Sequence, residues 1–320
     1  MSESRLGGRG LLGRVAGAPI TWGVCEVPGW GHQLGPKRVL AEMAQIGLRA
    51  TELGPEGYLP TKPGPLRQAL GAHDLRLVGG FVTAVLHRDP LTEQLALAAR
   101  SADLLATAGA DVLVLAADTG ETGYEGSLEL DAHEWSTLAQ GVGDVMELGA
   151  RRGLEVALHP HYGTAIEAPH QLARLLESSP VSLCVDTGHL LLGGADPVEV
   201  TRNALGRIAH VHLKDVAAEL AEQVRRGRVG YHQAVRRGLY RTLGAGDVDI
   251  AEIVRLLERS GYRGWYVLEQ DAVLEGDPRE HEGPIRDAGA SLTWLRRVAE
   301  EIEAEAVTQL VANGRPEAAR

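Results

Sequence analysis

Val181-Ser-Leu-Cys-Val-Asp186 and Ile208-Ala-His-Val-His-Leu213 are two short apolar runs separated by a helical segment at Pro197 to Leu205. Runs of this length are typical of parallel strands that are buried on both faces of a sheet. Parallel neighbours require a long crossover connection, which is usually a helix. The stretch therefore predicts a βαβ unit.

The same alternation of strand and helix recurs on both sides of this stretch. Eight strands are predicted at residues 18–23, 49–53, 75–82, 111–116, 154–159, 181–186, 208–213 and 265–269, with helices between them. Eight such units in 320 residues predict a closed (β/α)₈ barrel, the TIM barrel. An open doubly wound sheet often carries a GxGxxG turn after its first strand, and this sequence has none there.

The predicted domain organisation is simple. We expect a flexible N-terminal extension at residues 1–16, a single TIM-barrel domain at 17–302, and a helical or disordered C-terminal tail at 303–320. Two insertions, Asp118 to Leu130 and Val216 to Gly246, follow the fourth and seventh strands. Both therefore leave the carboxyl ends of strands, where barrel loops build active sites.

Composition narrows the class of protein. A net charge of −11 opposes a nucleic-acid surface and a polybasic membrane anchor. No apolar run reaches the ~20 residues of a membrane span, and residues 1–15 lack the apolar core of a signal peptide. The two cysteines, Cys25 and Cys184, do not suggest a disulfide framework. These features predict a cytoplasmic protein without nucleic-acid or membrane partners.

Polar side chains gather at the ends of the last four predicted strands. These side chains are His159, His161, Asp186, His189, His212, Lys214 and Glu269. Neighbouring strand ends converge at one mouth of a barrel, so imidazoles and carboxylates meet there and offer mixed nitrogen and oxygen ligands to a divalent metal ion. His210 and His212 share one face of their strand, which we predict to be the inner face, whereas Val211 and Leu213 face the helices.

Three of these residues also have a simpler interpretation. Asp186 could cap a helix that begins at Thr187, Glu269 could form a salt bridge across the mouth, and Lys214 with Asp215 could be a solvent-facing ion pair. The convergence of four strand ends favours a metal site over these separate roles.

Two residues near earlier strand ends are predicted to contact a substrate. Trp22 could stack on a sugar-like ring or pack into the rim of the barrel. Glu52 could hydrogen-bond a polyol or form a salt bridge at the rim. His87 and Arg88 after the third strand are weaker candidates.

These motifs resemble those of the xylose isomerase-like barrel superfamily and, within it, the inosose dehydratases. The resemblance covers about residues 17–300, and the matching stretches are Ala18-Pro-Ile-Thr-Trp-Gly23, Thr51-Glu-Leu-Gly-Pro-Glu-Gly-Tyr-Leu-Pro60, His159-Pro-His-Tyr-Gly-Thr164, Asp186-Thr-Gly-His189, His210-Val-His-Leu-Lys-Asp215, Leu243-Gly-Ala-Gly-Asp247 and Gly264-Trp-Tyr-Val-Leu-Glu-Gln-Asp271.

The resemblance implies one divalent metal ion, Mn²⁺ or Co²⁺ first and Mg²⁺, Zn²⁺ or Fe²⁺ as alternatives. It assigns Asp186, His212 and Glu269 as ligands. The superfamily usually has a Glu at the end of the fifth strand, where this chain has His159. Either His159 is the fourth ligand, which we favour because its strand end is rigid, or Glu167 reaches in from the following loop.

The implied reaction is dehydration of 2-keto-myo-inositol, a cyclic polyol, in inositol catabolism. His161, His189 and Glu269 are candidates for the base, and Lys214 or a protonated histidine for the acid; His161, His189 and Lys214 are also expected to contact the substrate. The alternatives are a metal-dependent ketose isomerase or epimerase and a 3-keto-sugar lyase. The less favoured alternatives are a non-catalytic sugar-binding barrel and an endonuclease-type barrel, and the net charge of −11 opposes the second. The resemblance also allows assembly into a homo-oligomer.

Overall fold

The computed structural model describes residues 10–121, 123–124 and 128–313, with side chains up to residue 308. Eight parallel strands close into a barrel in the order β1-β10-β7-β6-β5-β4-β3-β2, which confirms the predicted TIM barrel. The strands are β1 (Val15–Gly17), β2 (Ala50–Glu52), β3 (Arg76–Ala84), β4 (Val112–Ala117), β5 (Glu155–Leu158), β6 (Ser182–Asp186), β7 (Ile208–Leu213) and β10 (Tyr266–Leu268).

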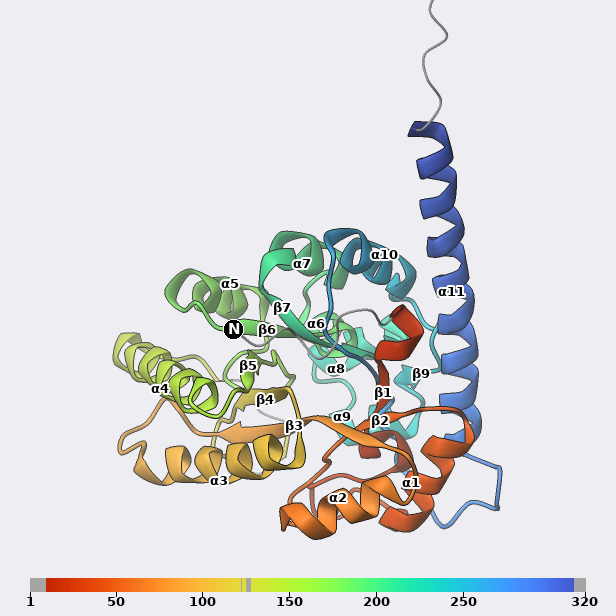
Figure 1. Cartoon of the computed structure of the whole chain (residues 1–320). Coiled ribbons are helices and arrows are strands. Elements are labelled where there is room, and N and C mark those ends of the chain that lie inside the picture. Colours follow the sequence, from red (N-terminus) through yellow and green to blue (C-terminus); the bar gives the residue numbers. More distant parts are fainter. Residues whose placement is uncertain (1–9, 122, 125–127, 314–320) are drawn as a thin grey trace, which may run out of the picture.

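Helices surround this barrel, and the final helix runs along one side and projects beyond it (Figure 1). The helices are α1 (Pro36–Gln45), α2 (Pro63–Gly71), α3 (Thr92–Ala108), α4 (Ala132–Ala150), α5 (Pro169–Ser178), α6 (Thr187–Gly193), α7 (Pro197–Ala204), α8 (Ala218–Arg225), α9 (Tyr231–Arg236), α10 (Ile250–Ser260) and α11 (Pro284–Asn313). None of the helices in the described part of the chain combines the length and the apolar character that a membrane crossing requires.

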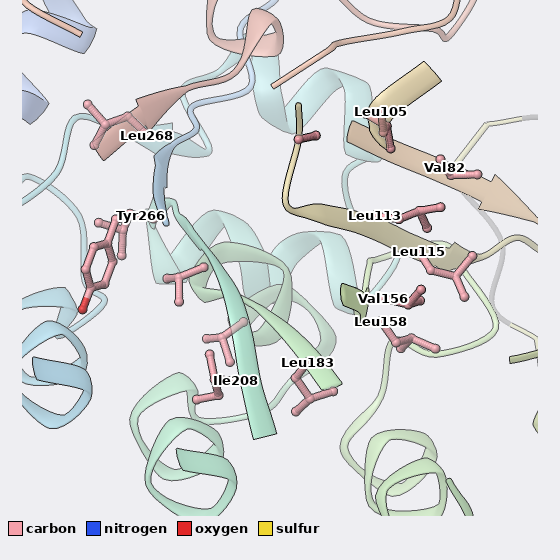
Figure 2. Packing of buried hydrophobic residues seen from close by; sticks show 14 of the residues in the cluster. Val82, Leu105, Leu113, Leu115, Val156, Leu158, Leu183, Ile208, Tyr266 and Leu268 are labelled. Carbon is pink, nitrogen blue, oxygen red and sulfur yellow. The ribbon is translucent and has the colours of Figure 1, made fainter. Parts of the chain in front are cut away.

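The two faces of each strand carry different side chains. Large apolar residues such as Leu113, Leu183 and Ile208 lie between the strands and the helices (Figure 2). On β7, Val211 and Leu213 belong to this outer core, whereas His210 and His212 bond to groups inside the barrel. The predicted inward orientation of the two histidines is therefore confirmed.

The N-terminal boundary differs from the prediction. The first strand was expected at residues 18–23, but β1 lies at Val15–Gly17, and Pro19–Trp22 form a 3₁₀ helix that Pro19 begins. Leu11–Arg14 form another 3₁₀ turn, and Arg14 is fully buried against Glu258, with N–O distances of 2.6 and 2.8 Å. Residues 11–16 therefore belong to the barrel. Residues 1–9 of the predicted extension lie outside the described part.

At the other end of the chain, α11 continues through the predicted tail as far as Asn313, and residues 314–320 lie outside the described part. Residues 122 and 125–127 of the predicted insertion at 118–130 lie outside the described part.

The insertion after β7 folds into a small cap, which we define as residues 215–246. Its ends pair as the antiparallel strands β8 (Asp215–Val216) and β9 (Tyr240–Arg241), and α8 and α9 lie between them. Side chains of the cap form an apolar cluster with Trp30, separate from the main core.

Asp215 fixes the base of the cap. Its carboxylate accepts hydrogen bonds from four backbone N–H groups, those of Val216, Gly244, Gly246 and Val248, at 2.8 to 3.2 Å. The suggested surface ion pair between Lys214 and Asp215 is therefore wrong, because Asp215 is buried and its oxygens are occupied by the backbone.

Candidate active site

A cavity of about 310 Å³ lies at the carboxyl ends of the barrel strands. One part of its lining is polar and comes from the ends of β5, β7 and β10. The polar residues there are His159, His161, His212, Lys214, Glu269 and Asp271. Apolar side chains, among them Ile20, Trp30 and Phe81, line other parts of the cavity. The cavity therefore combines a reactive polar patch with apolar walls, as binding sites for small molecules do.

Four predicted ligand atoms converge at the floor of this cavity. His159 Nε2 lies 3.3 Å from Asp186 Oδ2 and 3.2 Å from His212 Nδ1. His212 Nδ1 lies 3.5 Å from Asp186 Oδ2 and 3.1 Å from Glu269 Oε2. Ligand atoms about 2.1 Å from one ion are roughly 3.0 to 3.4 Å apart. The ligand atoms of Asp186, His212 and Glu269 all lie within 4.8 Å of one another, and His159 Nε2 contacts two of these groups, so the cluster could hold a single divalent ion.

The two carboxylate oxygens of Asp186 have different partners. Its Oδ1 accepts the N–H groups of Gly188 and His189, each at 2.8 Å, and so caps α6. Its Oδ2 faces the ligand cluster. Capping and metal ligation, which the sequence presented as alternatives, are compatible because they use different oxygens.

Glu52 lies behind His212 and not at the rim. Its Oε1 is 3.2 Å from His212 Nε2 and 2.9 Å from His210 Nε2. Burial opposes the charge on Glu52, but the two imidazoles outweigh it and hold the pKa of this carboxyl well below its ordinary value. A carboxylate on the far nitrogen of a ligating histidine fixes the orientation of the ring. This contact would give Glu52 an orienting role behind His212, and its burial does not fit the alternative of a salt bridge at the rim. Glu52 also belongs to the lining of the cavity, so its contact with a substrate stays a prediction.

The structure separates the two candidates for the fourth ligand. His159 lies in the cluster, and burial lowers its pKa, which favours the neutral form that binds metal. Glu167 directs its carboxylate at the backbone N–H of Gly163, at 2.6 Å. The geometry supports His159.

Lys214 lies at the edge of the ligand cluster. Its ammonium is 2.8 Å from Asp271 Oδ1, 3.0 Å from Glu269 Oε2 and 3.3 Å from Asp186 Oδ2. Burial opposes this charge, but the three carboxylates outweigh it and hold the pKa of Lys214 well above its ordinary value. Lys214 is therefore a buried cation that can donate hydrogen bonds into the cavity.

His161 and His189 stack face to face, with ring centroids 3.6 Å apart. Burial is the main cause that lowers the pKa of both rings well below the ordinary value, so both are neutral. His161 Nδ1 donates to the carbonyl of Tyr162 at 2.7 Å, which leaves its Nε2 as an acceptor. Lys214 donates to His189 Nε2 at 3.1 Å. Of the two rings, His161 therefore offers its Nε2 as an acceptor, whereas Nε2 of His189 already accepts from Lys214.

The predicted contact between Trp22 and a substrate is wrong. Its ring is fully buried, and its indole N–H donates to Glu42 Oε2 at 2.7 Å, behind the wall of the cavity. His87 is also buried and does not belong to the lining of the cavity, and neither does Arg88.

Asp271, Tyr231 and Tyr240 contact Lys214 or each other at the edge of the site and carry no role in the sequence prediction. Asp271 stands two positions after Glu269, on the same side of the chain if the strand direction continues, and this spacing was the available signal. Tyr231 and Tyr240 come from the cap, and their distance in sequence from the strand ends gave no signal.

Comparison with known proteins agrees with the barrel fold. The Xylose isomerase-like TIM barrel family matches residues 40–298. Inosose dehydratase of Geobacillus thermodenitrificans (strain NG80-2) is 32% identical over 266 residues, which cover 79% of this chain and 88% of that protein. Inosose dehydratase of Clostridium perfringens (strain ATCC 13124) is 30% identical over 264 residues, with the same coverage.

Solved structures share the fold at lower sequence identity. An L-ribulose 3-epimerase superposes with a TM-score of 0.69 at 15% identity, covering 95% of this chain and 99% of that one. A probable 3-DHS dehydratase from Bacillus anthracis superposes with a TM-score of 0.65 at 15% identity, covering 88% and 98%. Fold and sequence similarity agree: the chain belongs to the xylose isomerase-like TIM barrel family.

Proposed function

We propose that the protein is a metal-dependent hydro-lyase that removes water from 2-keto-myo-inositol (inosose) or a closely related cyclic keto-polyol. The observation that carries the proposal is the cluster of His159, Asp186, His212 and Glu269 beside Lys214 and the stacked histidine pair. Similarity to inosose dehydratases over 79% of the chain supports this choice of substrate.

The cluster would hold one divalent ion, Mn²⁺ or Co²⁺ by preference, and its nitrogen and oxygen donors also suit Mg²⁺, Zn²⁺ and Fe²⁺. Such an ion supplies Lewis-acid polarisation of the substrate ketone when it is bound. With Glu269 engaged in the cluster, the remaining base candidates are His161 and His189.

The side chains divide the proton transfers between them. An imidazole of the His161 and His189 pair takes the proton from the carbon next to the ketone, and the electron pair of that C–H bond moves into the enediolate. The Lys214 ammonium then gives a proton to the hydroxyl on the adjacent carbon. The C–O bond breaks, water leaves, and the resulting enol rearranges to the dione.

Product analysis tests this function. Protein loaded with Mn²⁺ or Co²⁺ is expected to convert inosose to a dione, and dialysis against a chelator is expected to abolish the conversion until the ion is returned. If loaded protein leaves inosose unchanged but epimerises a free ketose, the site serves an epimerase and the dehydratase proposal is wrong.

A further inference from the structure

The cap contributes two tyrosine hydroxyls to the edge of the active site. Tyr231 on α9 donates to Asp271 Oδ2 at 2.8 Å, and the hydroxyl of Tyr240 on β9 lies 3.0 Å from that of Tyr231. Both tyrosines are buried. Because the one proton of Tyr231 is used on Asp271, Tyr240 is the donor in the pair of hydroxyls.

Asp271 connects these hydroxyls to Lys214. Its Oδ1 lies 2.8 Å from Lys214 Nζ, which is shorter than the distances from Nζ to Glu269 and Asp186. The ring of Tyr240 contributes a second contact, since Nζ lies 5.1 Å from its centroid. Lys214 is therefore held on one side by the carboxylates of Asp186 and Glu269. On the other side it is held by Asp271, which is bonded to Tyr231 of the cap.

The cap is itself firmly placed. The carboxylate of Asp215, directly after Lys214, binds backbone N–H groups at both ends of the cap. Tyr231 and Tyr240 belong to the apolar cluster of the cap, together with Trp30 from the wall of the cavity. The two hydroxyls therefore take their positions from packing that lies outside the metal site.

We propose that Tyr231 is a positioning residue: through Asp271 it fixes the Lys214 ammonium where the departing hydroxyl of the substrate needs its proton, with Tyr240 in support. This inference rests on the proposed dehydratase function. Without the Tyr231 hydroxyl, Asp271 Oδ2 loses its donor and the carboxylate turns to share Lys214 between both oxygens. The ammonium then moves away from Glu269 and from the substrate.

The test compares three Tyr→Phe variants, each of which removes one buried hydroxyl. Tyr231→Phe removes the bond to Asp271, and Tyr240→Phe removes only the bond to Tyr231. Tyr266→Phe is the matched control, because its hydroxyl donates to Glu258 away from the cavity. We expect kcat to fall roughly 10- to 100-fold in Tyr231→Phe, less in Tyr240→Phe and little in Tyr266→Phe, since small misplacements of a catalytic group are costly. KM and bound metal should stay unchanged.

A second measurement separates positioning from general damage. In D₂O, exchange of the proton next to the substrate ketone reports the base, and dehydration also needs the acid. Tyr231→Phe is expected to slow dehydration while exchange continues, so that their ratio rises above that of the unmodified protein. Equal loss of both rates, or a kcat equal to that of Tyr266→Phe, would overturn the inference.

NMR of the lysine side chains can detect the contact between Lys214 and Asp271 in the absence of substrate. The chain has only three lysines, and Lys37 and Lys62 are exposed. With ¹³C-labelled lysine, the NMR signal of the Lys214 ε-carbon should shift in Tyr231→Phe and stay in place in Tyr266→Phe. If this signal shifts but the unmodified protein neither dehydrates nor exchanges inosose, the positioning contact stands and the proposed function fails. If the signal does not move, the positioning role is refuted.

Discussion

Replacement of Asp186 separates its two functions. Asp186→Asn keeps an oxygen that can accept the N–H groups of Gly188 and His189, but it puts an amide NH₂ where Oδ2 faces the ligand cluster. Asn caps helices about as well as Asp, whereas Ala does not cap them. We therefore expect both Asp186→Asn and Asp186→Ala to lose bound metal and activity, while only Asp186→Ala also loses the cap of α6.

The size of the difference follows from the cap alone. Both variants remove the same buried charge beside Lys214, so this cost cancels between them. The lost cap leaves Asp186→Ala about 1 kcal/mol less stable than Asp186→Asn in metal-free protein. That is about a fivefold change in the unfolding equilibrium.

Urea denaturation after chelator treatment measures the stability difference, and elemental analysis measures the bound ion. Two results would refute the reasoning. Full metal content in Asp186→Asn would exclude Oδ2 as a ligand, and equal stability of the two variants would exclude the cap.

Three further predictions test other parts of the structure. Arg14→Met removes the buried cation beside Glu258 and leaves this partly buried carboxylate with the Tyr266 hydroxyl as a donor. The free energy of unfolding should fall by about 3–5 kcal/mol in urea denaturation, and an unchanged midpoint would place Arg14 outside the fold. Trp22→Phe should lower stability by about 1.5–3 kcal/mol, through loss of the bond to Glu42, and leave KM for inosose unchanged, whereas a raised KM would make the indole a substrate contact after all. Asp215→Asn replaces one acceptor oxygen by a donor, so hydrogen exchange of the cap amides should become at least roughly tenfold faster while exchange of the α5 amides stays the same. An equal change in both would contradict the role of the Asp215 carboxylate in holding the cap.

Most of the barrel could be predicted because its strands are apolar and its helices amphipathic. β7 has the same bounds in the prediction and in the structure, Ile208–Leu213. β1 was misplaced because its residues, Val15–Gly17, are small and follow a Gly-rich segment, whereas the next residues are larger and apolar. The small size has a packing reason, since a Cβ on Gly17 would lie 2.9 Å from Leu48 Cδ1.

The convergence of His159, Asp186, His212 and Glu269 could be predicted because each lies at the end of its own strand and the barrel brings strand ends together. No comparable rule predicts which residues of two different loops will contact each other. The bond between Tyr231 and Asp271 joins residues 40 positions apart, and it depends on how the cap folds over the mouth. The role of Trp22 was predicted wrongly for another reason. An indole ring with one N–H can donate to a buried carboxylate such as Glu42 as readily as it can contact a substrate.

The pairing of β8 with β9 has a consequence for how such a protein diversifies. Asp215 lies opposite Arg241 and Val216 opposite Tyr240, so the chain leaves the barrel and returns to it at nearly the same point. The residues between them can lengthen, shorten or be exchanged without changing the register of any barrel strand. The cap can therefore change in length and sequence independently of the strand ends that carry His159, Asp186, His212 and Glu269.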